Sequence, residues 1–208
     1  MPGSGETATF RVPARVVRSI RKLTGMDVEV TGHLVFWRSG RLRTVLYDYD
    51  HQWVDRDAPD PDILFHTHPA DYATLYPDHP SVTDVQTTHN LMCRRREVVG
   101  HLVFTPKFLY LIEGNCDKRQ ARVNELARRA FDECRALTPD RNQEAFRTCY
   151  LRVLNSSGAA RVRRFDYPSD DGPVEMDLRL PPWRPVSLRT AGLILAASVA
   201  AVAALARV

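Results

Sequence analysis

Apolar and polar residues change their period several times along the chain, and each change marks an expected element. Residues 13–23 place valine, isoleucine and leucine at helical spacing, with a proline at the start, and Gly25 is suited to end that helix. Residues 27–50 then form a β-rich run, a turn at Ser39 and Gly40, and a second β-rich run. The sequence therefore predicts a helix followed by a β-hairpin.

The rest of the chain continues this mixture of periods. It predicts a short strand over residues 63–68, a helix over 81–94, two strands within 98–115 that turn near Pro106, helices over 117–137 and 139–155, and a final strand over 174–180. This mixture indicates the α/β (α+β) class, with a central mixed sheet flanked by helices in one domain, residues 1–182. A chain of 208 residues is long enough for one such core.

The C-terminal segment differs in composition from everything before it. Residues 191–206 carry no charge and would span about 24 Å as a helix, against a hydrocarbon core of roughly 30 Å. Flanking arginines could reach the interfaces and make up the difference. We expect a linker over residues 183–190 and a transmembrane helix over 191–208, with the domain facing the cytoplasm because its flank is positive. The alternative is a buried helix in a soluble cytoplasmic protein.

Basic residues outnumber acidic ones by 29 to 25, which gives a formal charge of +4. The arginines are spread over most of the chain, and the one dense cluster, residues 93–97, fits a solvated helix end. No nucleic-acid motif accompanies it, so the sequence predicts no specific nucleic-acid partner.

The four cysteines are widely spaced and include no CxxC pair. Neither a zinc-finger spacing nor the apolar core of a secretory signal is present. The sequence therefore predicts reduced thiols and a reducing compartment.

The candidate chemistry lies between residues 66 and 84. His66 and His68 alternate along a short strand, so both imidazoles face one side of it, and Asp84 lies one turn into the following helix. Two imidazoles and a carboxylate form the ligand set of a catalytic zinc with an open position for water. Each part also has an ordinary explanation, because Ser81 and Asp84 alone are typical of a helix N-terminus. The whole combination favours a metal site.

These residues resemble the signature of the JAMM (MPN-plus, or JAB-domain) zinc isopeptidases, which is a glutamate, then His-x-His-Pro, then Ser-x-x-Asp. The resemblance covers roughly residues 12–110, with the glutamate three residues before Gly32. It implies a JAB/MPN-like domain that hydrolyses peptide or isopeptide bonds in ubiquitin or ubiquitin-like protein conjugates. It assigns Zn²⁺ to His66, His68 and Asp84, the general base to Glu29, and a polarising hydroxyl to Ser81.

The loop between the two halves of the motif, residues 70–80, departs from the family pattern. It is about five residues longer, an insertion that adds little closure free energy. Its aromatic and apolar residues could form a lip that selects substrate or could pack on the domain, namely Tyr72, Leu75 and Tyr76. Asp71 or His79 could compete for the metal.

Two other classes of protein share parts of this pattern. A non-catalytic MPN-type scaffold would have the same fold, although all five motif positions are present here. A metal-dependent phosphoesterase can also begin with His-x-His, but it needs further ligands on a longer chain. The remaining histidines form no ligand pattern and are predicted to be surface or packing residues: His33, His51, His89 and His101.

Overall fold

The computed structural model describes residues 7–47, 60–70, 78–95, 97–138, 142–169 and 172–180. In chain order its elements are β1 (Thr7–Val12), α1 (Ala14–Lys22), the 3₁₀ turn η1 (Leu23–Gly25), β2 (Thr31–Phe36), β3 (Leu42–Tyr47), β4 (Asp62–Thr67), α2 (Val82–Arg94), β5 (Val98–Phe104), β6 (Phe108–Gly114), α3 (Gln120–Leu137), α4 (Gln143–Ser157), β7 (Ala160–Asp166) and β8 (Val174–Arg179). The predicted mixed α/β class is confirmed.

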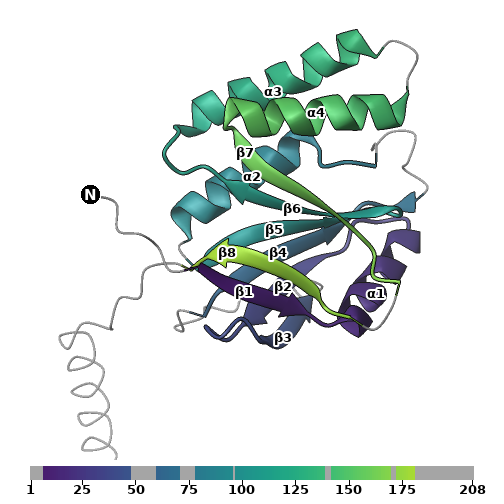
Figure 1. The fold of residues 1–208 in the computed structure, drawn as a ribbon, viewed down its shortest axis with the longest axis vertical. Helices are drawn as coiled ribbons and strands as arrows, with labels where there is room; N and C mark the ends of the chain where they lie inside the picture. Colours follow the sequence, from purple (N-terminus) through teal and green to yellow (C-terminus); the bar gives the residue numbers. More distant parts are fainter. Residues whose placement is uncertain are drawn as a thin grey trace, which may run out of the picture.

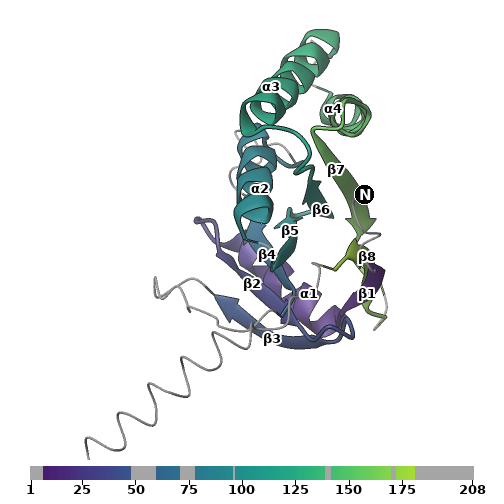
Figure 2. The same cartoon turned by 90° about the vertical axis from the view of Figure 1, so that its left-hand side faces the viewer.

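A six-stranded sheet in the order β3-β2-β4-β5-β6-β7 separates two layers. Helices α2, α3 and α4 cover one face, while the β1–β8 ribbon and α1 cover the other (Figures 1 and 2). Neighbouring strands are antiparallel except β4 and β5, which are parallel. The predicted central mixed sheet is therefore present, and it carries a separate apolar core on each face.

Strand β4 lies in the interior of this sheet, and all of its residues are buried. Ile63 and Phe65 point into the core beneath the β1–β8 ribbon. Because side chains alternate along a strand, Leu64 and His66 face the helical layer instead. The strand ends where the His68 N–H donates to the Phe104 carbonyl at 2.8 Å, so the second histidine is held at the carboxyl end of β4.

Two glycines allow the β2–β3 hairpin to form beside β4. A Cβ on Gly32 would lie 2.5 Å from the Phe65 ring and 2.3 Å from the Leu46 carbonyl oxygen, so only glycine fits where β2 crosses that ring. Gly40 has a φ of 79°, which glycine adopts readily, and it makes the predicted turn between β2 and β3.

Most of the predicted elements are confirmed, with boundary shifts at the two long helices. Helix α3 begins at Gln120 rather than at residue 117, and α4 begins at Gln143 behind an Asn142 cap. Strands β1 and β7 were not predicted. In β7, arginines alternate with the buried Ala160 and Val162, and their charge masks the period of the strand.

The prediction of reduced thiols is wrong for this structure. Cys93 at the end of α2 is bonded to Cys116 after β6, and Cys134 of α3 is bonded to Cys149 of α4. The pairs are 23 and 15 residues apart in sequence, but packing brings their Cα atoms within 5.4 and 5.7 Å. The reducing compartment was predicted from reduced thiols, so the two disulfides remove the observation behind that prediction.

The predicted linker and transmembrane helix, residues 183–208, lie outside the described residues. Within the part of the chain that the structure describes, no helix has both the length and the apolar character needed to cross a bilayer.

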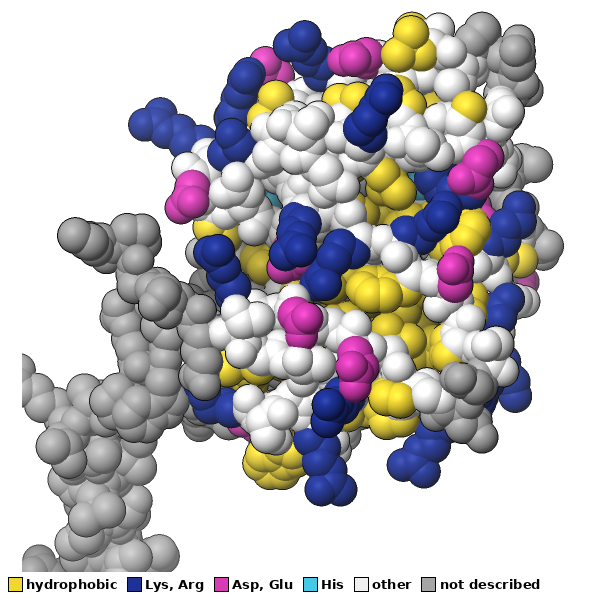
Figure 3. Space-filling view, in the orientation of Figure 1, with side chains coloured by type: hydrophobic (Ala, Val, Ile, Leu, Met, Phe, Trp, Pro, Cys, Tyr) yellow, Lys and Arg dark blue, Asp and Glu magenta, His cyan; other side chains and the backbone are white. Residues whose placement is uncertain are grey.

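Charged side chains of both signs are interspersed on the face drawn in Figure 3, which shows arginines and lysines beside acidic residues. Among the described residues, charged side chains also pair across neighbouring strands, for example Arg163 of β7 with Glu113 of β6 at 3.2 Å. The absence of a specific nucleic-acid partner stays a prediction.

Candidate metal centre

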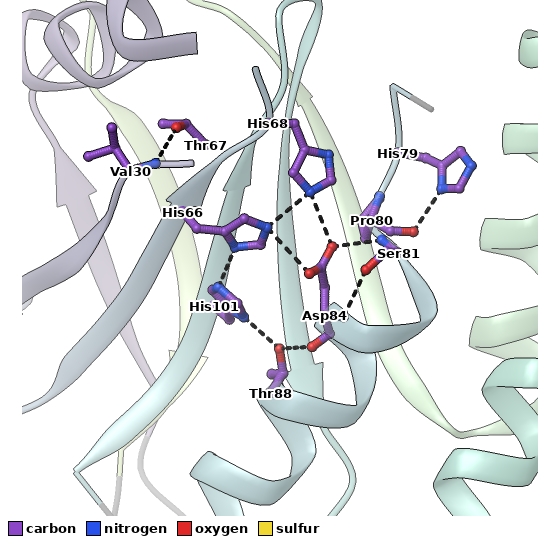
Figure 4. A network of polar contacts seen from close by, with 10 residues as sticks. All are labelled: Val30, His66, Thr67, His68, His79, Pro80, Ser81, Asp84, Thr88 and His101. Atoms are coloured by element: carbon purple, nitrogen blue, oxygen red, sulfur yellow. Dashed lines mark hydrogen bonds and ion pairs between the residues drawn. The ribbon is translucent and has the colours of Figure 1, made fainter. Parts of the chain in front are cut away.

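Three side chains from two elements converge at the carboxyl end of β4 (Figure 4). The Nε2 atoms of His66 and His68 are 3.0 Å apart. The Asp84 carboxylate approaches His66 Nε2 at 3.3 Å through Oδ1 and His68 Nε2 at 3.4 Å through Oδ2. Ligands about 2.0–2.1 Å from a tetrahedral ion lie roughly 3.3 Å from one another. The spacing of these atoms therefore fits a bound metal ion.

The Asp84 carboxylate and the two imidazoles favour each other's charged forms. Burial alone would lower the pKa of His66, but the charge and hydrogen bond of Asp84 raise that pKa above its ordinary value of 6.5, with a smaller contribution from Glu29. Burial alone would raise the pKa of Asp84, but His66 and His68 hold it well below 3.8. A positive charge between these groups is thus favoured, whether it is a proton or a metal ion.

Helix α2 delivers Asp84 through its first turn. Ser81 is the N-cap, and its Oγ accepts a hydrogen bond from the Asp84 N–H at 3.0 Å. The Ser81 N–H donates in return to Asp84 Oδ2 at 2.7 Å, which completes a capping box. Ser81 and Asp84 therefore form both a helix N-terminus and a part of the candidate metal site, because the capping box that starts the helix also points the carboxylate at the imidazoles.

Glu29 lies two residues before β2, at the edge of this cluster. Thr31 pairs with His66, and Val30 and Thr67 exchange hydrogen bonds at 2.9 Å. Continuing this antiparallel register places the backbone of Glu29 level with His68. Glu29 is exposed, whereas the imidazoles are buried, so the carboxylate belongs to the solvent side of the site.

The segment leading into Ser81 is anchored to α4 and β6. The Asp78 carbonyl accepts a hydrogen bond from Tyr110 at 2.8 Å, and the Asp78 carboxylate faces Arg147 of α4 at 3.7 Å. His79 donates from Nδ1 to the Pro80 carbonyl at 2.7 Å and packs against Phe146 and Tyr150. Burial lowers the pKa of His79 to about 4.

Among the described residues, the converging ligand atoms do not include one from His79, so its possible competition for the metal stays a prediction. The other proposed competitor, Asp71, and the predicted lip residues lie outside the described residues: Tyr72, Leu75 and Tyr76.

His101 of β5 was predicted to be a packing or surface residue, and the structure places it in direct contact with His66. Its Nε2 is 2.8 Å from His66 Nδ1, and its Nδ1 is 2.8 Å from Thr88 Oγ1 on α2. Burial, followed by the charge of His66, lowers the pKa of His101 to about 3. A single histidine in a wholly buried strand was the signal in the sequence, because a buried ring nitrogen needs a partner.

His33 is also buried, and it contacts Asp62 at 2.8 Å through Nδ1. A cavity of about 190 Å³ lies between α2 and strands β2 and β4, lined in part by His33, His66 and His101. His89 is buried on α2 and has no place in the converging group, and His51 lies outside the described residues.

The fold and the site together define a mixed α/β domain with a buried His–His–Asp group that could hold a metal ion. Comparisons with protein-family models, with curated proteins and with solved structures found no significant match to the chain. Any proposal about a metal or a reaction therefore rests on the chemistry of the named residues.

Proposed function

We propose that this protein is a zinc-dependent isopeptidase or peptidase that removes ubiquitin or a ubiquitin-like modifier from other proteins. The observation that carries the proposal is the convergence of His66 Nε2, His68 Nε2 and the Asp84 carboxylate within 3.0–3.4 Å of one another. Two imidazoles and one carboxylate leave a tetrahedral ion one open position, which is the arrangement of catalytic rather than structural zinc.

A zinc ion in this group would act as a Lewis acid and lower the pKa of a bound water to about 7. Glu29, on the solvent side, would accept the proton of the attacking water and return it to the leaving amine. Ser81 accepts a hydrogen bond from the Asp84 N–H, and its own hydroxyl proton can be donated to the oxyanion that develops on the scissile carbonyl. In this scheme Glu29 transfers the proton, and Ser81 stabilises the negative charge on the carbonyl oxygen.

The test is cleavage of isopeptide-linked substrates by the full chain in mild detergent. A panel of ubiquitin chains and ubiquitin-like conjugates is incubated with and without a chelator. We expect the chelator to stop cleavage and added zinc to restore it. Glu29→Gln should lower kcat by about 10²–10⁴-fold without changing the zinc content.

Glu125→Gln is the matched control, because Glu125 is an exposed carboxylate on α3 that pairs with Arg122. It should leave kcat unchanged. Cleavage that neither the chelator nor Glu29→Gln reduces would rule out this mechanism, and protein without stoichiometric zinc would favour the non-catalytic scaffold.

We propose further that residues 191–208 anchor the protein in a membrane, so that its substrates are conjugates at that membrane. An alkaline wash that releases the whole chain into the soluble fraction would contradict the anchor. The predicted cytoplasmic orientation needs a separate test, because disulfides persist mainly in oxidising compartments. Protection of the domain from protease in sealed vesicles distinguishes the two orientations.

A further inference from the structure

A chain of buried polar contacts runs behind the metal centre and returns to it (Figure 4). The Thr88 hydroxyl donates to the Asp84 carbonyl at 2.6 Å and is 2.8 Å from His101 Nδ1. His101 Nε2 is in turn 2.8 Å from His66 Nδ1. The contacts connect α2, β5 and β4, so they link the helix that carries one candidate ligand to the strand that carries another.

The number of available protons fixes which atom donates and which accepts at each of these polar contacts. The Asp84 carbonyl can only accept, so the single proton of the Thr88 hydroxyl is used there. The hydroxyl oxygen must then accept from His101, which places the proton of a neutral His101 on Nδ1. His101 Nε2 is consequently an acceptor, and His66 must donate to it from Nδ1. The lone pair of a neutral His66 is left on Nε2.

That nitrogen is the one that faces the other two candidate ligands, at 3.0 Å from His68 Nε2 and 3.3 Å from Asp84 Oδ1. Metal-ligating histidines almost always donate their second ring N–H to an acceptor, which fixes the tautomer and the ring orientation. His101 and Thr88 are both buried, at 6% and 0% exposure, which limits competition from water for these contacts.

We infer that His101 and Thr88 are positioning residues of the metal centre, which hold His66 in the tautomer and ring orientation that present Nε2 to the ion. The inference rests on the proposed metal-dependent function. The opposite direction would run from the Thr88 hydroxyl through His101 to His66 and would protonate His66 Nε2. It would leave the 2.6 Å contact between Thr88 and the Asp84 carbonyl without a hydrogen.

The first test reads the tautomers directly in the full chain labelled with ¹⁵N-histidine. Long-range ¹H–¹⁵N correlation spectra of zinc-loaded protein should show His101 protonated on Nδ1, with His66 protonated on Nδ1 and metallated on Nε2. Thr88→Val should allow His101 to populate the other tautomer, because the acceptor of its Nδ1 proton is gone. His101 protonated on Nε2 in the unaltered protein would overturn the inference.

The second test measures zinc affinity by competition with a chromophoric chelator. Loss of an outer partner of a ligating histidine typically weakens metal binding by about 10–100-fold. We expect a weakening in this range for His101→Phe and a smaller one for Thr88→Val. His101→Gln should restore much of the affinity, because its amide oxygen can still accept the proton of His66 Nδ1. Thr87→Val, the same change at the preceding and exposed position of α2, should have no effect.

Equal loss in His101→Phe and His101→Gln would indicate a packing role and overturn the inference, as would unchanged affinity in both. If His101→Phe does not fold, Thr88→Val and the tautomer spectra still decide the question. Both readouts are independent of substrate. Zinc binding that responds to His101 in a protein without isopeptidase activity would refute the proposed function alone. Isopeptidase activity in a protein whose zinc binding does not respond to His101 would refute this inference alone.

Discussion

His66 and His68 hold their Nε2 atoms 3.0 Å apart in the protein interior, with the Asp84 carboxylate 3.3–3.4 Å from both. Two imidazole lone pairs at this distance repel each other unless a positive charge lies between them. Only a proton or a metal ion can supply that charge in so small a space. Substitutions at Asp84 and Ser81 can separate metal binding from the effects of the helix cap and the fold.

Asp84→Asn should remove zinc binding while preserving helix α2. The amide oxygen can still accept the Ser81 N–H of the capping box, but it lacks the charge that a cation requires. We expect a loss of affinity beyond the roughly 100-fold typical of outer contacts. Metal content and circular dichroism measure the two effects, and Asp177→Asn on β8 is the matched control. Stoichiometric zinc in Asp84→Asn would exclude this residue as a ligand.

Ser81→Ala should lower kcat by about 10²–10³-fold, the usual effect of losing one donor to an oxyanion. It should also destabilise the protein by about 1 kcal/mol, because a helix cap is lost. Ser81→Thr keeps the hydroxyl and should retain most of both properties. Asn142→Ala removes the cap of α4, where the Asn142 side chain accepts from the Ala145 N–H at 3.1 Å. It should cause similar destabilisation with unchanged kcat, and a comparable fall in kcat would assign the effect of Ser81 to stability.

The stabilisation by zinc should grow as the pH rises. In metal-free protein the raised pKa of His66 stabilises the fold fully below 6.5, and this contribution disappears as the pH rises through the folded pKa. The lowered pKa of Asp84 stabilises the fold above 3.8, and that contribution is lost as the pH falls through the folded value.

Zinc must displace the proton from His66, so binding weakens in acid. The zinc-induced rise in Tm should therefore be small near about pH 5 and large near about pH 8. Thermal melts with and without zinc across this range measure it, with Asp84→Asn as the unresponsive control. An increment that stays constant with pH would contradict a proton held in the metal position.

Reduction of the two disulfides should destabilise the protein without removing the metal ligands. Loops of 23 and 15 residues correspond to about 3 kcal/mol each in the chain-entropy model. Alkylation and mass spectrometry of the unfolded protein should detect no free thiol before reduction and four after it. Urea unfolding of Cys134→Ala/Cys149→Ala measures one contribution. Four reactive thiols without reductant would restore the original prediction.

Local patterns predicted the elements that depend on local interactions. The β2–β3 hairpin follows from its Gly40 turn, and α2 follows from the Ser81 cap. Strand β1 could not be predicted in this way, because its pairing partner is β8, at the other end of the domain. The disulfides depend similarly on how α2 meets the segment after β6 and how α3 packs on α4.

The candidate ligands were predictable because their spacing along a strand and a helix start has a direct geometric meaning. His101 was not, because its contact with His66 arises from the parallel pairing of β4 with β5, where His101 lies opposite Leu64. Local sequence patterns predict neither the register of that strand pair nor the contact that Thr88 of α2 makes with His101. The supporting contacts of a site are therefore harder to predict than its ligands.

The carboxylate of Asp84 closes the first turn of α2 as well as facing the two imidazoles. A related sequence that bound no metal would still benefit from an aspartate at this position, since the helix would begin less well without it. Persistence of that acid among divergent sequences is consequently poor proof of an active enzyme. Loss of either neighbouring imidazole would be the more informative sign that the metal site is absent.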